Sequence, residues 1–222
     1  MSLSRRELVE LADELDALPG AGAAEAYRPR YNIAPTDIHP IVRLDGKRRL
    51  LEPAEWGFVR EGRPPLFNAR AETAALKEAF RDAFVGGRCV VPADGFFEWT
   101  SAGDDRRPFW IRRADGKLLL LAGLYEPAGP LQDGGWRFTV LTTNPNATIA
   151  PLHDRMPVIL EPIDVATWLR HGSPALLHPA PDGTLLTTPV SRRVNSVRND
   201  DPACLEPETP ETAPQKRQLD LF

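Results

Sequence analysis

Glu98 is the residue of this sequence whose neighbours point most directly to acid–base chemistry. It lies in Gly-Phe-Phe-Glu-Trp, between Phe97 and Trp99. A carboxyl group among aromatic side chains is expected to have a raised pKa, because burial disfavours its charged form. Such a group can donate or accept a proton near neutral pH. The alternative is a strand whose Phe97 and Trp99 point inward while Glu98 faces solvent.

His153 is the second candidate, since it lies in a charged segment, Pro-Leu-His-Asp-Arg-Met, that follows a predicted strand. A histidine beside charged residues can act as an acid or a base, and it can equally serve to bond a backbone carbonyl. The histidines and cysteines do not occur at the spacings of metal ligands. The sequence therefore predicts neither a metal site nor a cofactor.

Asn68 and Arg70 lie in Phe-Asn-Ala-Arg-Ala-Glu-Thr, directly before a predicted helix. Asn68 could orient a substrate, and Arg70 could bind a phosphate group. Alternatively, Asn68 is a turn residue and Arg70 pairs with Glu72. The sequence has neither a glycine-rich phosphate loop nor a Gly-x-Ser-x-Gly motif, so nucleotide hydrolysis and serine esterase chemistry lack support.

Arginines are frequent near the turns that adjoin these segments, and Trp56 lies among them. Arginine together with an exposed aromatic ring is typical of proteins that bind single-stranded nucleic acid, where phosphates meet guanidinium groups and bases stack on rings. The alternative is a scattered, solvated surface. A net charge of −4 argues against sequence-independent coating of nucleic acid but allows a local basic groove. The arginines concerned are Arg28, Arg30, Arg60, Arg63, Arg155, Arg192, Arg193 and Arg198.

The composition indicates a soluble protein of ordinary globular type. The 222 residues suffice for one large domain or two small ones, with 42% hydrophobic and 26% charged residues. No apolar run approaches the roughly 20 residues of a membrane span, and the charged N-terminal segment does not resemble a secretion signal. The two cysteines do not make a disulfide framework, and Cys89, in a valine-rich strand, is expected to be buried. We therefore expect a cytoplasmic protein with no membrane association.

Two helices are expected from the spacing of apolar residues. Leucines at helical spacing follow a Ser-x-x-Glu capping box near the N-terminus, and this helix is expected to end near Pro19-Gly20. A second helix is expected over residues 71–84, with Leu76, Phe80 and Phe84 on one face.

Strands are expected over most of the remaining sequence. Hairpins are predicted around Asp45-Gly46 and Asp115-Gly116, and two short strands surround the Pro-Ala-Asp-Gly turn that precedes Glu98. Asp164 could cap a further short helix. Because there is no β-α-β alternation, these elements predict a single α+β domain with a curved, mostly antiparallel sheet and peripheral helices.

The C-terminal segment has the composition of a disordered tail, because residues 206–215 are rich in Pro, Glu and Thr. The domain is therefore expected to span residues 1–198 and the tail residues 199–222. The tail ends in large apolar side chains that could fill a pocket on another protein. The alternative is that these side chains fold back onto the domain. The terminal motif, which consists of Gln218, Leu219, Asp220, Leu221 and Phe222, resembles the peptide with which bacterial replication and repair proteins bind the sliding clamp.

Eight segments of the chain, taken together and in order, resemble the SOS response-associated peptidase (SRAP) family, whose members shield abasic sites in DNA. The resemblance covers roughly residues 1–207. The segments are RYNIAPT, WGF, NARAET, RCVVPADGFFEW, LAGLYEP, TVLTTNPN, LHDRMPVIL and VSRRVNSVRNDDPACLEP.

The resemblance implies a single α+β domain around a barrel-like sheet, with a groove for single-stranded DNA that contains abasic sites. Family members capture the ring-opened aldehyde of an abasic site with the α-amine of an N-terminal cysteine, and the thiol then closes on the Schiff base to give a thiazolidine. Asn68 matches the asparagine that positions the cysteine, Glu98 matches the acid/base, and His153 matches the histidine that assists ring opening and crosslink reversal. We accordingly expect a monomeric, nucleoid-associated protein of the DNA damage response.

The resemblance also implies which residues contact DNA. Arg70 and Arg155 match arginines that bind phosphates, and Trp56 and Pro35 match positions in the groove. The Pro-x-Trp that usually follows Trp56 in the family is replaced here by Arg60-Glu61-Gly62. The groove contacts near this replacement are therefore expected to differ from those of the family.

A second departure concerns the nucleophile. The family begins Met-Cys-Gly-Arg, whereas this chain begins Met1-Ser2-Leu3-Ser4. We expect this segment to be absent from the sequence and not mutated, as it would be after a start codon assigned too late or where a vector-derived leader replaces it. The alternative is a real loss of the cysteine, which would leave a non-covalent module that binds single-stranded DNA. A third reading takes the family name literally, as a thiol peptidase.

Overall fold

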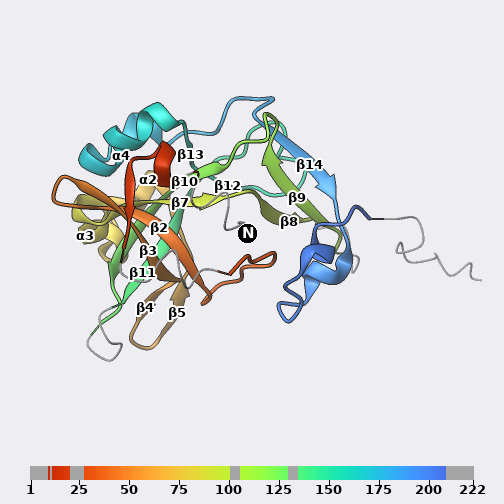
Figure 1. Cartoon of the computed structure of the whole chain (residues 1–222), viewed down its shortest axis with the longest axis horizontal. Helices are drawn as coiled ribbons and strands as arrows, with labels where there is room; N and C mark the ends of the chain where they lie inside the picture. Colours follow the sequence, from red (N-terminus) through yellow and green to blue (C-terminus); the bar gives the residue numbers. More distant parts are fainter. Residues whose placement is uncertain (1–9, 11, 21–27, 101–105, 130–134, 209–222) are drawn as a thin grey trace, which may run out of the picture.

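A closed five-stranded barrel forms the core of the fold (Figure 1). Its strands, in order round the ring, are β3 (Arg48–Trp56), β2 (Ile38–Asp45), β7 (Arg88–Ala93), β10 (Leu119–Pro127) and β11 (Trp136–Thr143). Each strand pairs antiparallel with the next, and a parallel pairing of β11 with β3 closes the ring. The computed structural model describes residues 10, 12–20, 28–100, 106–129 and 135–208.

Both faces of the barrel strands are buried, which explains why β7 and β10 are almost continuously apolar instead of alternating. One set of side chains, which includes Val91, Leu121 and Phe138, packs together inside the barrel. The alternate set, which includes Val90 and Leu120, packs against helices on the outside. The predicted hairpin around Asp45-Gly46 is confirmed, since β2 and β3 pair across it.

Short helices cover the outside of the barrel, and α3 and α4 lie on the side away from the second sheet described below (Figure 1). Phe80 and Trp168 are buried in these contacts. Asp164 precedes α4 as predicted, but its side chain makes no capping hydrogen bond. No helix within the described ranges is long and apolar enough to cross a membrane. The helices are α2 (Ala71–Ala74), α3 (Glu78–Gly86) and α4 (Val165–His171).

The prediction of one helix over residues 71–84 is wrong, because the segment forms two helices. Lys77 has an extended backbone conformation, with φ −75° and ψ 128°, and it separates α2 from α3. Leu76 lies in this break and is 79% exposed, whereas Phe80 is buried as predicted.

The N-terminal helix also differs from the prediction. Its described helical residues end at Glu14, and residues Ala17–Pro19 form the strand β1, which pairs in parallel with β3. Asp16 makes the reversal with φ 48°. Leu18 is consequently 51% exposed instead of lying on the apolar face of the helix. The predicted capping box lies outside the described residues.

A second, three-stranded sheet lies beside the barrel, in the order β14, β9, β8 (Figure 1). Its strands are β8 (Phe96–Trp99), β9 (Pro108–Arg113) and β14 (Leu185–Pro189). The predicted hairpin around Asp115-Gly116 is therefore wrong. The turn exists, but β9 pairs with β8 and β14 while β10 pairs within the barrel sheet. The turn thus carries the chain from one sheet to the other.

The remaining short strands either extend the barrel sheet or form a separate hairpin. β6 (Asn68–Arg70), β12 (Met156–Pro157) and β13 (Ile159–Leu160) extend the barrel sheet, and β4 (Phe58–Arg60) pairs with β5 (Arg63–Leu66) as a separate hairpin.

Residues 199–208 pack on the domain, beyond residue 198, where the sequence places the start of the tail. Two 3-10 helices, Arg192–Asn195 and Pro202–Cys204, lie in this C-terminal segment, which runs beside β9 and β14 (Figure 1). Cys204 is fully buried, and Val190 forms a β-bridge with Pro207. The terminal motif, Gln218–Phe222, lies outside the described residues.

Candidate functional site

A depression lies where the second sheet meets the barrel, and it gathers the candidate residues of the folded body. Its inner part, here called the inner cavity, has a volume of about 310 Å³. A wider outer groove of about 1030 Å³ adjoins it and shares several lining residues. The inner cavity is lined by Trp56, Asn68, Arg70, Glu98, His153 and Arg155, and the outer groove adds Pro35.

Strand β6 presents Asn68 and Arg70 to the inner cavity. It pairs in parallel with β11, with Asn68 opposite Val140 and Arg70 opposite Thr142. Because side chains alternate along a strand, Asn68 and Arg70 share one face, while Ala69 between them is 1% exposed and packs in the core. The turn predicted as an alternative for Asn68 is thus replaced by a strand position.

Glu98 lies on β8 and faces the depression, whereas its neighbour Phe97 is buried. Burial raises the pKa of the Glu98 carboxyl; the nearby His153 opposes this shift and Asp154 adds to it. The raised pKa expected from the sequence is therefore confirmed. A carboxyl group that keeps its proton to higher pH can donate it to a reacting oxygen.

His153 is held by the backbone two residues further on. Its Nδ1 atom lies 3.0 Å from the Arg155 backbone nitrogen, 3.1 Å from the Arg155 carbonyl oxygen and 3.3 Å from Asp154 Oδ1, so it accepts or donates a hydrogen bond according to the tautomer. Residues in the described ranges offer no hydrogen-bond partner to Nε2, so this atom is available to a ligand in the cavity.

Arg155 is bound tightly to Glu72 on the wall of the inner cavity. Its two Nη atoms donate to the Glu72 carboxylate oxygens at 2.9 and 2.8 Å, to Asn144 Oδ1 at 3.0 Å and to the Thr142 carbonyl at 2.6 Å. These four contacts use every Nη hydrogen of the guanidinium. The hydrogen bond from Arg155 holds the pKa of the Glu72 carboxyl below its ordinary value.

Arg70 contrasts with Arg155, because Arg70 has no ion pair among the described residues. The sequence left open a pair between Arg70 and Glu72, but Glu72 binds Arg155 instead. An arginine without a carboxylate partner keeps its donors for an incoming anion. Of the two arginines in the inner cavity, Arg70 is thus the one whose donors are free.

Trp56 and Pro35 stand at the junction of the inner cavity and the outer groove. The Trp56 Nε1–H donates to the Phe67 carbonyl at 2.9 Å, and the ring stacks on Phe138 with centroids 6.1 Å apart. The loop that carries Pro35 is tied to the same tryptophan, since the Thr36 N–H donates to the Trp56 carbonyl at 2.9 Å. Trp56 therefore has a fixed orientation.

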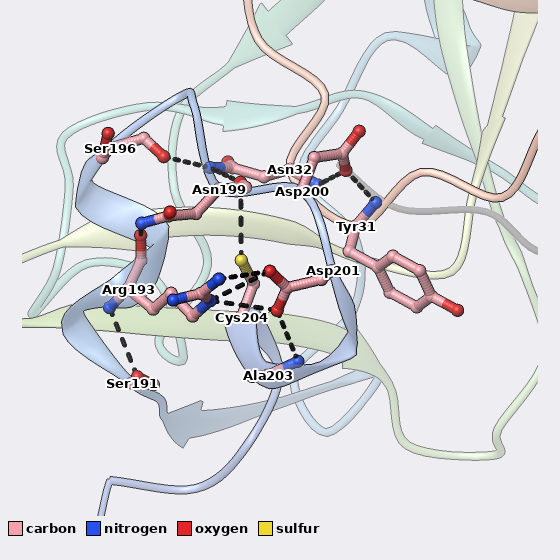
Figure 2. A network of polar contacts seen from close by, with 10 residues as sticks. All are labelled: Tyr31, Asn32, Ser191, Arg193, Ser196, Asn199, Asp200, Asp201, Ala203 and Cys204. Carbon is pink, nitrogen blue, oxygen red and sulfur yellow. Dashed lines mark hydrogen bonds and ion pairs between the residues drawn. The ribbon is translucent and has the colours of Figure 1, made fainter.

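A polar joint connects this loop to the C-terminal segment, and the sequence did not predict it (Figure 2). Asp200 accepts hydrogen bonds from the backbone N–H groups of Tyr31 and Asn32 at 2.6 and 2.9 Å, and from the Arg30 guanidinium. The Asn32 side chain donates to the carbonyls of Val194, Ser196 and Asn199 at 3.0–3.1 Å. Because Asn32 and Val194 both line the outer groove, the joint fixes two of its walls.

Three of the eight arginines highlighted in the sequence serve the fold. Arg30, Arg60 and Arg193 pair with carboxylates, and none of these three lines the depression. Cys89 is fully buried, as predicted. Among the described residues, no group of three or more His, Cys, Asp or Glu side chains could hold a metal ion.

Sequence reasoning missed the far end of the outer groove, where Trp99, Arg106 and Asn195 lie. Trp99 had been considered only as an inward-facing neighbour of Glu98. Arg106 lies in a polar segment without a motif, so no sequence signal distinguished it from a surface residue.

The sequence of this chain matches one protein family along most of its length. The chain matches the SOS response associated peptidase (SRAP) family over residues 2–197. It is 35% identical to the abasic site processing protein YoqW of Bacillus subtilis, over 81% of this chain and 87% of YoqW. It is 33% identical to YedK of Escherichia coli, over 80% and 84% of the two chains, and 30% identical to HMCES of Gallus gallus, over 82% and 67%. The chain therefore belongs to the SRAP family.

A solved structure supports the fold. A protein from Bacteroides thetaiotaomicron superposes with a TM-score of 0.78 at 21% identity, covering 90% of this chain and 96% of that one. The α+β fold with a barrel-like sheet and peripheral helices, as expected from the sequence, is thus confirmed.

Proposed function

We propose that this protein recognises abasic sites in single-stranded DNA and links to them covalently, which protects the lesion during the DNA damage response. The observation that carries the proposal is the inner cavity, where a carboxyl group with a raised pKa, Glu98, and the imidazole of His153 share one space with Arg70, which forms no ion pair among the described residues. The relatives YoqW, YedK and HMCES, which are named abasic site processing proteins, support it.

The nucleophile in this proposal comes from outside the described residues. No lysine or cysteine of the described ranges lines the inner cavity or the outer groove. Burial raises the pKa of the thiols of Cys89 and Cys204, so neither supplies a reactive thiolate. The attacking group is therefore proposed to be the α-amine of a cysteine in a Met-Cys-Gly-Arg segment ahead of Met1.

The proposed reaction forms two bonds to the aldehyde carbon and releases one water. The amine nitrogen attacks the carbonyl, Glu98 protonates the oxygen, and the oxygen leaves as water to give a Schiff base. The thiol sulfur then adds to the same carbon, and its proton passes to the nitrogen as the thiazolidine ring closes. An α-amine has a pKa of about 8, so a useful fraction is neutral at neutral pH.

The remaining residues of the cavity position the DNA and the nucleophile. Asn68 is proposed to orient the cysteine, and His153 Nε2 to assist opening of the sugar ring and reversal of the crosslink. Arg70 meets a phosphate directly. Arg155 can do so with an Nη hydrogen only by giving up one of its contacts to Glu72, Asn144 or the Thr142 carbonyl.

The test is a denaturing gel of the protein mixed with abasic single-stranded DNA. The chain as given is expected to leave no heat-stable shifted band without added reductant, whereas the same chain with Met-Cys-Gly-Arg ahead of Met1 is expected to leave one. If the extended protein binds the DNA but forms no band, the function is non-covalent binding of single-stranded DNA. Cleavage of unrelated protein substrates would instead favour a thiol peptidase.

The terminal motif is proposed to bind the sliding clamp of the replication machinery. Leu219, Leu221 and Phe222 would fill an apolar pocket while Gln218 fixes the register. Titration of the clamp with the isolated tail peptide is expected to give a weak contact, which the Leu221→Ala/Phe222→Ala peptide loses. Equal binding of both peptides, or no binding of the unmutated one, would remove the clamp from the proposed partners.

A further inference from the structure

We propose that Trp99 and Arg106 form a subsite for the nucleotide adjacent to the abasic residue, with the phosphate on Arg106 and the base against Trp99. This inference rests on the proposed function, since it assigns a second part of the same DNA strand to the outer groove. The inner cavity measures about 310 Å³ and the outer groove about 1030 Å³. The groove therefore has room for more of the strand than the sugar that lacks its base.

The Trp99 ring is held in one orientation, so it can serve as a rigid stacking surface. It follows Glu98 on β8, so the platform begins one residue from the proposed acid. Its Nε1–H donates to Asn195 Oδ1 at 2.7 Å, and its ring packs beside Phe97 with centroids 6.4 Å apart. The indole is partly exposed to the groove. An aromatic ring held in this way loses little conformational entropy when a base stacks on it.

Arg106 supplies the cation of the subsite. Its guanidinium carbon lies 5.6 Å from the centre of the Trp99 ring. Within the described part of the chain Arg106 has no carboxylate partner, whereas the next residue, Arg107, pairs with Glu208. Apart from Arg106, the ionisable side chains of the outer groove are Glu98 and His153 at its inner end. A phosphate at the outer end would therefore meet a positive charge that no carboxylate of the described residues neutralises.

Another part of the groove wall is apolar and fixed. Val197 is 67% exposed and lines the groove together with Val194. The Asn32 hydrogen bonds to the carbonyls of Val194 and Ser196 hold this wall in place. Figure 2 shows the bond to Ser196. An aromatic ring, an arginine and an exposed aliphatic side chain along one groove are the features with which proteins bind single-stranded nucleic acid irrespective of sequence.

The test measures binding of the chain as given to three abasic single-stranded oligonucleotides by fluorescence anisotropy. One is short, one is lengthened on the 5′ side of the abasic site, and one is lengthened on the 3′ side. Lengthening on the side that reaches the subsite is expected to tighten binding about 10-fold. Arg106→Ala and Trp99→Leu are expected to lose most of that gain while keeping the affinity for the other two oligonucleotides. Arg106→Ala should also lower the slope of log K against log salt by about 1.

Arg112 offers a matched control, because its guanidinium lies 5.7 Å from the Trp110 ring but lines neither part of the depression. Arg112→Ala removes the same charge and is expected to leave all three affinities unchanged. Because Trp99 packs in a small apolar cluster, the folding of Trp99→Leu is checked by thermal unfolding. If Trp99→Leu is unfolded, the result for Arg106→Ala alone decides the test, because Arg106 is exposed.

Three results would overturn the subsite. In the first, Arg106→Ala binds all three oligonucleotides as the unmutated protein does. In the second, Arg106→Ala weakens binding of all three oligonucleotides equally, which indicates long-range electrostatic attraction and not a local subsite. In the third, the unmutated protein binds no abasic DNA, which contradicts the proposed function as well and so is distinguished from failure of the subsite alone.

Discussion

The inner cavity and the outer groove share the strand β8, yet their polar groups are held in different ways. In the inner cavity, the Glu98 carboxyl is partly desolvated and the four Nη hydrogens of Arg155 are occupied. In the outer groove, Arg106 has no ion pair among the described residues and Val197 is 67% exposed.

This difference separates two roles. In the proposed reaction, the desolvated carboxyl group and the imidazole act on the reacting atoms, so changes to them should alter the rate of the chemical step. An exposed cation and an exposed aliphatic side chain gain partners only when DNA arrives, so changes to them should alter affinity. Arg70 lies at the boundary, because it lines the inner cavity but has free donors.

The largest expected effect is on the rate. In the protein that carries Met-Cys-Gly-Arg ahead of Met1, Glu98→Gln should slow crosslinking about 100-fold or more, because the amide cannot donate the proton that the leaving oxygen needs. Binding to abasic DNA should remain unchanged. Time courses at saturating DNA measure the rate, and an unchanged rate would contradict the role of Glu98.

The next effect is on affinity. Arg70→Ala should weaken DNA binding about 10-fold and lower its salt dependence by about one counterion, because one phosphate contact is lost. Crosslinking at saturating DNA should keep its rate. Arg63→Ala is the control, since Arg63 is exposed on β5 and lines neither part of the depression. Equal weakening by both variants would show a general effect of charge.

A smaller effect is expected from the joint that holds the outer groove. Asp200→Ala leaves the Tyr31 and Asn32 N–H groups without their acceptor, which should lower the free energy of unfolding by about 1–3 kcal/mol. Asp200→Asn keeps an acceptor and loses only the charge partner of Arg30, so it should destabilise less. Both should weaken binding of the lengthened oligonucleotide several-fold without slowing crosslinking at saturation. A lower crosslinking rate at saturating DNA would show that these hydrogen bonds contribute to the chemical step.

The stability that the Asp200 carboxylate contributes should depend on pH. Burial alone would raise its pKa, but the N–H groups of Tyr31 and Asn32 and the Arg30 guanidinium outweigh burial and lower it. A lowered pKa means that this contribution is present above the ordinary pKa of an aspartate and is lost as the pH falls through the folded-state value. Acid titration of unfolding should therefore show a smaller difference between the protein and Asp200→Ala at low pH.

The smallest effect is on stability through Glu98. Because burial raises the pKa of Glu98, ionisation of this carboxyl opposes folding. The stability that the protonated carboxyl contributes is therefore lost as the pH rises through the folded-state pKa. Glu98→Gln should therefore have a slightly higher melting temperature than the unmutated protein at neutral pH and an equal one at acid pH. The opposite order at neutral pH would show that the charged carboxylate stabilises the fold.

The inner cavity could be predicted from sequence to a large extent, because its residues lie in short segments of distinct chemistry. Glu98 was found through its aromatic neighbours, and its raised pKa follows from their burial. The strands of the barrel were recognisable by apolar runs and by the turn at Asp45-Gly46. The sequence does not reveal that β9 and β10 belong to different sheets. A turn motif indicates that the chain reverses, but it does not indicate which strands then pair.

The outer groove was missed because it depends on contacts between distant segments. Asp200 lies 168 residues from Asn32, and its neighbours in sequence have the polar composition of a tail. Local composition cannot reveal that the Asp200 carboxylate meets backbone donors of another loop, nor that Cys204 is buried. The same limit applied to Leu76, whose helical spacing predicted burial although the extended backbone at Lys77 breaks the helix.

The most direct test of the central claim is the intact mass of the product formed by abasic single-stranded DNA and the protein that begins Met-Cys-Gly-Arg, after removal of the initiator methionine. The account predicts one adduct, heavier than the protein by the mass of the oligonucleotide less one water, on the N-terminal cysteine peptide. Glu98→Gln should form the same adduct more slowly. An adduct on any other residue, or no adduct while the DNA is bound, would contradict the assignment of the inner cavity to this chemistry.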